Sequence, residues 1–150
     1  MKSILFVCLG NICRSPLAEG IAKDLAEKSS TDIVIDSAGT GHWHVGNPPC
    51  ENSIKVASNH GIDIANLRAR KVISEDKKKF NYIIVMDENN YQDLTDLGFE
   101  NLYKIGDFGD FKGACVPDPY YASGFEGFEE VYDMLDICIK DFLKTKGLLR

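Results

Sequence analysis

The stretch that decides the fold is ILFVCLGNICRSPLAEG, residues 4–20. It begins with an apolar, β-branched run of the kind found in strands that are buried on both faces. The run ends at Cys8 and is followed by a Gly-Asn turn, by Arg14 and by Ser-Pro. Ser15 is predicted to cap a helix, with Pro16 at its first position. The chain therefore opens with a strand, a short loop and a helix.

Strand-like and helix-like segments alternate through the rest of the chain. The pattern predicts further strands at residues 32–39, 82–86 and 101–105, and helices at residues 49–60, 74–80, 88–97 and 125–146. Such alternation favours an α/β three-layer sandwich, a four-stranded, twisted parallel sheet with helices on both faces. The length fits a single domain, residues 1–150. A long loop, residues 106–124, has little regular pattern.

Three predicted strands end at polar residues: Cys8, Ser37 and Asp87. In an open parallel sheet, the binding crevice lies beyond the carboxyl ends of the strands. We therefore expect these three groups to meet at one edge of the sheet. Asp87 is also placed to cap the helix that follows it.

The composition excludes several classes of protein. The formal net charge of −6 argues against general binding of nucleic acid or of an anionic membrane, which depends on a basic face. No apolar run approaches the roughly 20 residues that span a bilayer. The first residues lack the long apolar core and the cleavage site of a secretory signal. We expect a cytoplasmic protein without a membrane span.

The five cysteines, at positions 8, 13, 50, 115 and 138, contain no Cys-x2-Cys pair. A zinc site and a secreted disulfide framework are therefore disfavoured, and most of the thiols are expected to be reduced. Cys138 lies in an apolar helical pattern and is predicted to be a small buried hydrophobe. Cys13 is either a packed residue or a partner of Cys8 in a reversible disulfide. Cys50 and Cys115 carry no specific signal.

The loop from Cys8 to Arg14 has the features of an oxyanion site. A helix N-terminus offers unpaired N–H groups, Gly10 and Asn11 suit a strained backbone that turns amides inward, and Arg14 can hold two phosphate oxygens. The same groups favour an ionised thiol, and Ser15 is expected to lie close enough to donate to it. A thiolate beneath a phosphate is a nucleophile. The alternative, a buried core cysteine beside a solvated arginine, does not explain the flanking strand, turn and helix start.

A general acid is predicted in VPDPYYASG, residues 116–124. The leaving oxygen of an aryl phosphate needs a proton, and Asp118 lies on a restrained loop that can reach the site. By itself Pro-Asp-Pro is more often a turn. Tyr120 and Tyr121 are expected to form one wall of an aromatic slot. Trp43 is either the facing wall or a core anchor.

Together these motifs resemble the low-molecular-weight protein tyrosine phosphatase family. VCLGNICRSPLAEG, DSAGT, NHGI, VMDENN and DPYY occur in the family's order across nearly the whole chain. The resemblance implies that Cys8 forms a phosphocysteine, that Arg14 clamps the phosphate oxygens and that Asp118 serves as acid and then as base. It also implies that Ser15 stabilises the thiolate and that Asp87 orients Arg14.

The resemblance further implies supporting and lining residues. Asn11, held by Ser37 and His60, is expected to keep the loop in its strained shape. Cys13 matches a second thiol that protects the nucleophile. The residues expected to bind phosphate or to line the slot are Leu9, Gly10, Asn11, Ile12, Cys13, Ser15, Trp43, Tyr120 and Tyr121. Family members need no metal or cofactor, so none is expected.

The predicted activity is hydrolysis of protein phosphotyrosine and of small aryl phosphates. The expected partners are tyrosine-phosphorylated proteins, with inorganic phosphate or other oxyanions as competing ligands. One alternative is a module that binds phosphotyrosine without turnover. Another is a thiol-dependent arsenate reductase, although the cysteine pair that those enzymes carry near the third strand is missing. The similar arginine phosphatases carry Thr where this chain has Ile12. The least similar segment is residues 97–116.

Overall fold

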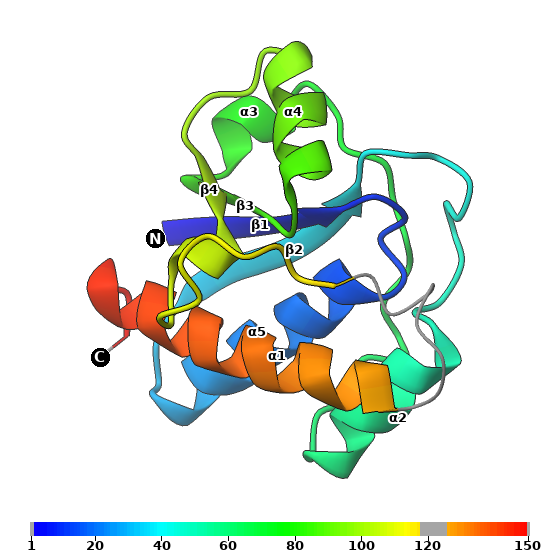
Figure 1. The fold of residues 1–150 in the computed structure, drawn as a ribbon, viewed down its shortest axis with the longest axis vertical. Coiled ribbons are helices and arrows are strands. Elements are labelled where there is room, and N and C mark those ends of the chain that lie inside the picture. Colours follow the sequence, from blue (N-terminus) through cyan, green and yellow to red (C-terminus); the bar gives the residue numbers. More distant parts are fainter. Residues whose placement is uncertain (1, 118–125, 150) are drawn as a thin grey trace.

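The computed structural model describes residues 2–117 and 126–149 (Figure 1). In this part of the chain the sheet has the strand order β2-β1-β3-β4, and all its pairings are parallel. The strands are β1 (Lys2–Cys8), β2 (Ile33–Gly39), β3 (Tyr82–Val85) and β4 (Leu102–Lys104). At one end of the sheet, Cys8 pairs with Gly39, and Val7 lies between Ala38 and Val85. The predicted α/β architecture is confirmed.

Helices cover both faces of the sheet (Figure 1). On one face lie α1 (Arg14–Lys28), α2 (Glu51–Asn59) and α5 (Glu126–Thr145), and on the other lie α3 (Asp76–Lys79) and α4 (Glu88–Asp96). Side chains alternate along β1. Ile4 and Phe6 therefore pack in the core with α1 and α5, while Leu5 and Val7 pack with Leu94 of α4. The sheet is thus buried on both sides, as its apolar strands predict.

Helix α1 begins two residues earlier than predicted, and its cap is different. Its first residue is Arg14 and its N-cap is Cys13, which makes no side-chain capping bond. Ser15 is therefore not the N-cap, and Pro16 is the third helical residue. The physical reason is that the Ser15 hydroxyl is engaged by Cys8 and Asn11 in the preceding loop. Proline is tolerated there because the first turn has no intrahelical acceptors for its N–H groups.

The other helix boundaries follow their local signals more closely. α2 ends at Asn59, and Gly61 adopts a φ of +78°, the left-handed conformation that suits glycine after a helix. Asp87 caps α4 with a reciprocal capping box that includes Asn90, as predicted for Asp87. α3 is shorter than predicted and begins at Asp76 rather than Ser74, because the Asp76 carboxylate accepts the Ile73 N–H and fixes the turn before it.

The segment after β4 returns to the sheet edge where β1 and β3 end. It passes through a short 3-10 helix, Ile105–Asp107, and then Val116 N–H donates to Met86 O at 2.8 Å. Of the predicted loop 106–124, residues 118–124 lie outside the described residues. In the described part of the chain, no helix is long and apolar enough to cross a membrane.

Candidate active site

Cys8 lies at the end of β1 and is buried at the start of the loop of residues 8–14, here called the Cys8 loop. Its Sγ accepts the main-chain N–H of Asn11 at 3.3 Å and lies 3.0 Å from Ser15 Oγ. Because Ser15 Oγ accepts from Asn11 Nδ2 at 2.8 Å, its own hydrogen is free to point to the sulfur. Two donors therefore converge on the Cys8 sulfur.

Asn11 holds the turn of the Cys8 loop. Its φ is +56°, in the left-handed region that few residues other than glycine adopt. Its side-chain Nδ2 donates to Ser15 Oγ and to Ser37 Oγ, and its Oδ1 accepts the main-chain N–H of Arg70 at 3.0 Å. Ser37 in turn donates to Glu19 at 2.6 Å. The strained residue is thus held by three hydrogen bonds from its own side chain.

The expected contact between Asn11 and His60 is wrong. His60 lies beyond α2 and stacks on Tyr132 of α5, with a centroid distance of 3.8 Å. Its Nε2 lies 3.6 Å from a carboxylate oxygen of Glu129. His60 therefore packs on α5, and the Arg70 main chain donates to Asn11 in place of His60.

Arg14 is the first residue of α1 and is 3% exposed. Its Nη1 donates to Asp87 Oδ2 at 2.6 Å and to Val116 O at 3.1 Å. This contact supports the predicted role of Asp87 in orienting Arg14. The bond from Arg14 also holds Val116 at the site, and Val116 lies two residues before Asp118 in the sequence.

The segment after β2 packs against the Cys8 loop. Thr40 N–H donates to Cys8 O at 3.0 Å, and Gly41 N–H donates to Leu9 O at 2.9 Å. A Cβ atom built at Gly39 would lie 2.8 Å from Leu9 O, so this close approach requires glycine. The strand end and the loop are therefore in direct contact through their main chains.

The expected slot residues are only partly described. Leu9 and Trp43 are exposed, at 37% and 65%, and Ile12 is half-buried. The Trp43 ring lies over Gly41 and stacks with His42 at a centroid distance of 5.6 Å, so it is not a core anchor. Gly10 lies beside His44. Asp118, Tyr120 and Tyr121 lie outside the described residues, so their roles stay predictions.

Cys13 differs from its prediction. It forms a disulfide with Cys50, the N-cap of α2, while Cys8 is a free thiol. Cys13 is therefore not among the reduced thiols, and in this state it has no free thiol to pair with Cys8. The reversible disulfide between Cys8 and Cys13 on oxidation stays a prediction. The Cys50 N–H also donates to Ile12 O at 2.6 Å, and Ser53 Oγ donates to Cys13 O. The disulfide thus joins α2 to the end of the Cys8 loop.

Cys138 is buried as predicted, and burial raises the pKa of its thiol to about 12.

Sequence reasoning missed Arg70, Glu19 and Cys50. Arg70 lies 59 residues from its partner Asn11, and Cys50 lies 37 residues from its partner Cys13. No local sequence pattern predicts contacts over such separations. Glu19 looks like an ordinary helix carboxylate, but it is 3% exposed, accepts from Ser37 and pairs with Lys23. Within the described ranges, no cluster of His, Cys, Asp and Glu is suited to hold a metal ion.

Comparison with known proteins identifies the family. The family model for low molecular weight phosphotyrosine protein phosphatases matches residues 3–148. The chain belongs to this family. The match confirms the resemblance read from the sequence and the predicted class of enzyme, a low-molecular-weight protein-tyrosine phosphatase.

Individual relatives agree with this assignment. The low molecular weight protein-tyrosine-phosphatase YfkJ of Bacillus subtilis is 47% identical over 133 residues, which are 84% of this chain and 85% of that protein. The crystal structure of YfkJ from Bacillus subtilis superposes with a TM-score of 0.90 over 98% of this chain and 95% of that chain, at 40% identity. The structure of the Drosophila arginine phosphatase DARP gives a TM-score of 0.92 at 32% identity, over 97% of this chain and 98% of that chain.

Proposed function

We propose that this chain hydrolyses phosphotyrosine in proteins, and small aryl phosphates, through a phosphocysteine formed on Cys8. The observation that carries the proposal is the pair of donors on Cys8 Sγ, the Asn11 N–H and the Ser15 hydroxyl, at the N-terminus of α1. A buried thiolate in that position faces the partial positive charge of the helix, where an anion binds favourably. The unit that acts is the single domain, residues 1–150.

In the proposed first step, the Cys8 thiolate attacks phosphorus. The S–P bond forms as the bond from phosphorus to the tyrosine oxygen breaks. Asp118 delivers a proton to that oxygen, so tyrosine leaves as a neutral hydroxyl. Arg14 holds two of the phosphate oxygens, an arrangement supported by the Asp87 carboxylate that fixes its guanidinium.

In the second step, water attacks phosphorus and the S–P bond breaks. Asp118, now a carboxylate, takes the proton from the attacking water, and Cys8 leaves as the thiolate. Inorganic phosphate is the product, so it and similar oxyanions are expected to compete for the same loop. No step uses a metal ion or a cofactor.

The substrates that we propose are tyrosine-phosphorylated proteins of the cytoplasm. The exposed Leu9 and Trp43 and the half-buried Ile12 support an apolar slot beside the Cys8 loop, with Tyr120 and Tyr121 assigned to it by the family resemblance. An aryl ring stacks between aromatic walls with a gain of about 0.5–1.5 kcal/mol beyond its buried area.

The first experiment is hydrolysis of p-nitrophenyl phosphate in excess EDTA, with the wild type and Cys8→Ser side by side. We expect turnover in the wild type and none in the variant. Tight binding of a phosphotyrosine peptide without phosphate release would instead favour a binding module. Reduction of arsenate coupled to thiol consumption would favour an arsenate reductase.

A second candidate function is hydrolysis of phosphoarginine, which the similarity to the Drosophila arginine phosphatase suggests. Ile12 distinguishes the two, because the arginine phosphatases carry Thr at this position. Competing phosphotyrosine and phosphoarginine peptides of the same sequence decide between them. We expect kcat/KM to be higher for the phosphotyrosine peptide than for the phosphoarginine peptide. We expect Ile12→Thr to lower the ratio of these two kcat/KM values.

A further inference from the structure

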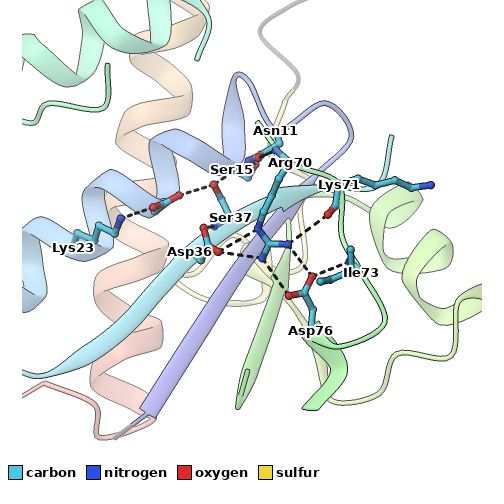
Figure 2. Close-up of polar contacts among 10 residues, drawn as sticks. Asn11, Ser15, Lys23, Asp36, Ser37, Arg70, Lys71, Ile73 and Asp76 are labelled. Atoms are coloured by element: carbon cyan, nitrogen blue, oxygen red, sulfur yellow. Dashed lines mark hydrogen bonds and ion pairs between the residues drawn. The ribbon is translucent and has the colours of Figure 1, made fainter. Parts of the chain in front are cut away.

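Arg70 joins the Cys8 loop to the sheet (Figure 2). Its main-chain N–H donates to Asn11 Oδ1 at 3.0 Å, and its main-chain carbonyl accepts the Gly39 N–H at 2.8 Å. The segment that follows continues this contact, since Val72 N–H donates to Gly39 O at 2.8 Å. The main chain of residue 70 therefore lies between the loop and the end of β2.

The Arg70 side chain fixes that main chain in place. Its Nε and Nη2 donate to Asp36 Oδ2 at 3.2 and 3.1 Å. Its Nη1 and Nη2 donate to the two carboxylate oxygens of Asp76 at 3.0 and 3.2 Å. Figure 2 shows the guanidinium between the two carboxylates, one from β2 and one from the start of α3. A planar guanidinium suits such forked contacts, and an ammonium group does not reproduce them.

The Arg70–Asp76 pair joins a half-buried guanidinium to a buried carboxylate. Asp76 is 2% exposed and also accepts the Ile73 N–H at 2.9 Å, so its carboxylate needs the arginine to compensate its charge. Burial alone would lower the pKa of the Arg70 guanidinium, but the bonds to Asp76 and the charge of Asp36 outweigh it and leave the pKa raised. Arg70 is therefore charged at every pH at which the protein is folded.

Asn11 depends on this arrangement. It holds a left-handed backbone that costs of order 1 kcal/mol, and its amide faces the Cys8 sulfur. In the described part of the chain, the Arg70 N–H is the donor to Asn11 Oδ1. A shift of residue 70 would turn the Asn11 side chain, and with it the two hydroxyls that Nδ2 contacts.

We propose that Arg70, clamped between Asp36 and Asp76, is a positioning residue that acts through Asn11 to aim the loop amide and the Ser15 hydroxyl at the Cys8 sulfur. The inference rests on the proposed function only in assigning Cys8 as the nucleophile. Arg70 touches neither the sulfur nor a substrate. Its effect is to keep a strained loop in the conformation that stabilises the thiolate.

The test compares Arg70→Lys with the wild type in two assays. The first measures kcat and KM for p-nitrophenyl phosphate. The second measures the rate at which iodoacetamide alkylates Cys8 from pH 4 to pH 9, without reductant so that the Cys13–Cys50 disulfide stays intact. A Cys115→Ser background removes the exposed thiol, and Cys138 is buried and stays protonated in this range.

We expect Arg70→Lys to lower kcat about 10- to 100-fold with a smaller change in KM, since misplacing a reacting group by about 1 Å costs up to 100-fold. The alkylation profile is expected to move to higher pH, because the thiolate loses its donors. Arg70→Met should show both effects more strongly. Asp36→Asn, which leaves the pair of Arg70 with the buried Asp76 intact, should show them weakly and stay folded.

Arg68→Lys is the matched control. Arg68 is exposed two residues away, and its guanidinium donates only to the nearby carbonyls of Ala65 and Leu67 among the described residues. Thermal unfolding of each variant separates loss of folded protein from loss of positioning. We expect Arg68→Lys to match the wild type in both assays.

The two assays keep this inference separate from the proposed function. If folded Arg70→Lys and Asp36→Asn have the wild-type alkylation profile, the positioning role is overturned, even where the wild type is an active phosphatase. A shift in the alkylation profile supports the role whether or not p-nitrophenyl phosphate is hydrolysed. A lower melting temperature with unchanged kcat and profile means that Arg70 is only structural, and also overturns the inference.

Discussion

One carboxylate oxygen of Asp87 lies 2.6 Å from Arg14 Nη1, while the other accepts the Asn90 N–H at 2.8 Å and caps α4. A single side chain therefore secures a helix start and aims the candidate phosphate clamp. Substitution can separate the capping of α4 from the contact with Arg14, because asparagine caps a helix about as well as aspartate but carries no charge.

We predict that Asp87→Asn lowers kcat/KM for p-nitrophenyl phosphate about tenfold or more, since a hydrogen bond to a charged group contributes about 1.5–3 kcal/mol. Asp87→Ala is the companion variant. It should lose the same activity and, in addition, about 1 kcal/mol in the free energy of unfolding relative to Asp87→Asn, because it also loses the cap. Steady-state kinetics and urea titrations measure the two quantities. Wild-type kcat/KM in Asp87→Asn would refute the role in orienting Arg14.

Ser15→Ala is predicted to move the alkylation profile of Cys8 to higher pH, because the sulfur loses a hydroxyl donor at 3.0 Å. Ser53→Ala is the matched control. Ser53 is equally buried and close to the same loop, but its hydroxyl donates to the Cys13 carbonyl. The profile of Ser53→Ala should not move, and equal shifts in both variants would mean that the effect is not specific to Cys8.

Asp118→Asn is predicted to lower kcat about 10²- to 10⁴-fold, the contribution of a general acid. The loss should be larger with phenyl phosphate than with p-nitrophenyl phosphate, since the poorer leaving group depends more on protonation. Asp110→Asn, an exposed carboxylate earlier in the same connection, is the control and should retain wild-type kcat. An equal loss with both substrates would argue that Asp118 is not the acid.

The Cys13–Cys50 disulfide closes a loop with a sequence separation of 37. Chain-entropy arguments give such a cross-link about 3–4 kcal/mol of stabilisation. We predict that a mild phosphine reductant lowers the free energy of unfolding of the wild type by this order and leaves that of Cys50→Ser unchanged. Denaturant titrations with and without reductant measure the effect, and thiol counting by mass spectrometry reports the bond itself.

The same disulfide changes the expected response to peroxide. A sulfenic acid on Cys8 can condense with a thiol at Cys13, losing water and forming a disulfide that reductant reverses. While Cys13 is bonded to Cys50, that thiol is absent. We predict that activity returns with reductant after treatment of Cys50→Ser, which frees Cys13, with excess peroxide. In Cys13→Ser a second peroxide molecule oxidises the sulfenic acid to a sulfinic acid, and activity does not return. Equal recovery in the two variants would exclude Cys13 as the protecting thiol.

The sequence predicts well what is decided by neighbouring residues. The apolar run before Cys8, the Gly-Asn turn and the polar strand ends indicate the sheet, the loop and the edge where Cys8, Ser37 and Asp87 gather. Asn11 has the left-handed φ expected of that turn, whereas Gly10 does not have a positive φ. The start of α1 differs from the prediction because the Ser15 hydroxyl contacts Cys8 and Asn11 instead of capping the helix. Local capping rules do not account for such contacts.

Contacts between distant segments could not be predicted in this way. Cys50 is bonded to Cys13 because α2 begins beside the Cys8 loop, and Arg70 reaches Asn11 because residues 69–72 run along the end of β2. The family resemblance implies that His60 contacts Asn11, but the packing of α2 against α5 places His60 on Tyr132. In each case, the partner is chosen by the packing of whole elements rather than by a motif.

Gly39 ends β2 with no side chain, at a point where a Cβ would lie 2.8 Å from Leu9 O and 3.2 Å from Asn11 Cβ. Glycine inside a strand costs roughly 0.5–1 kcal/mol relative to alanine. Alanine would recover that energy only if the Cys8 loop moved away from the sheet, because the atom that its Cβ would meet is a main-chain oxygen. The contact therefore closes this route to higher stability, and stabilising substitutions have to be sought elsewhere in the chain.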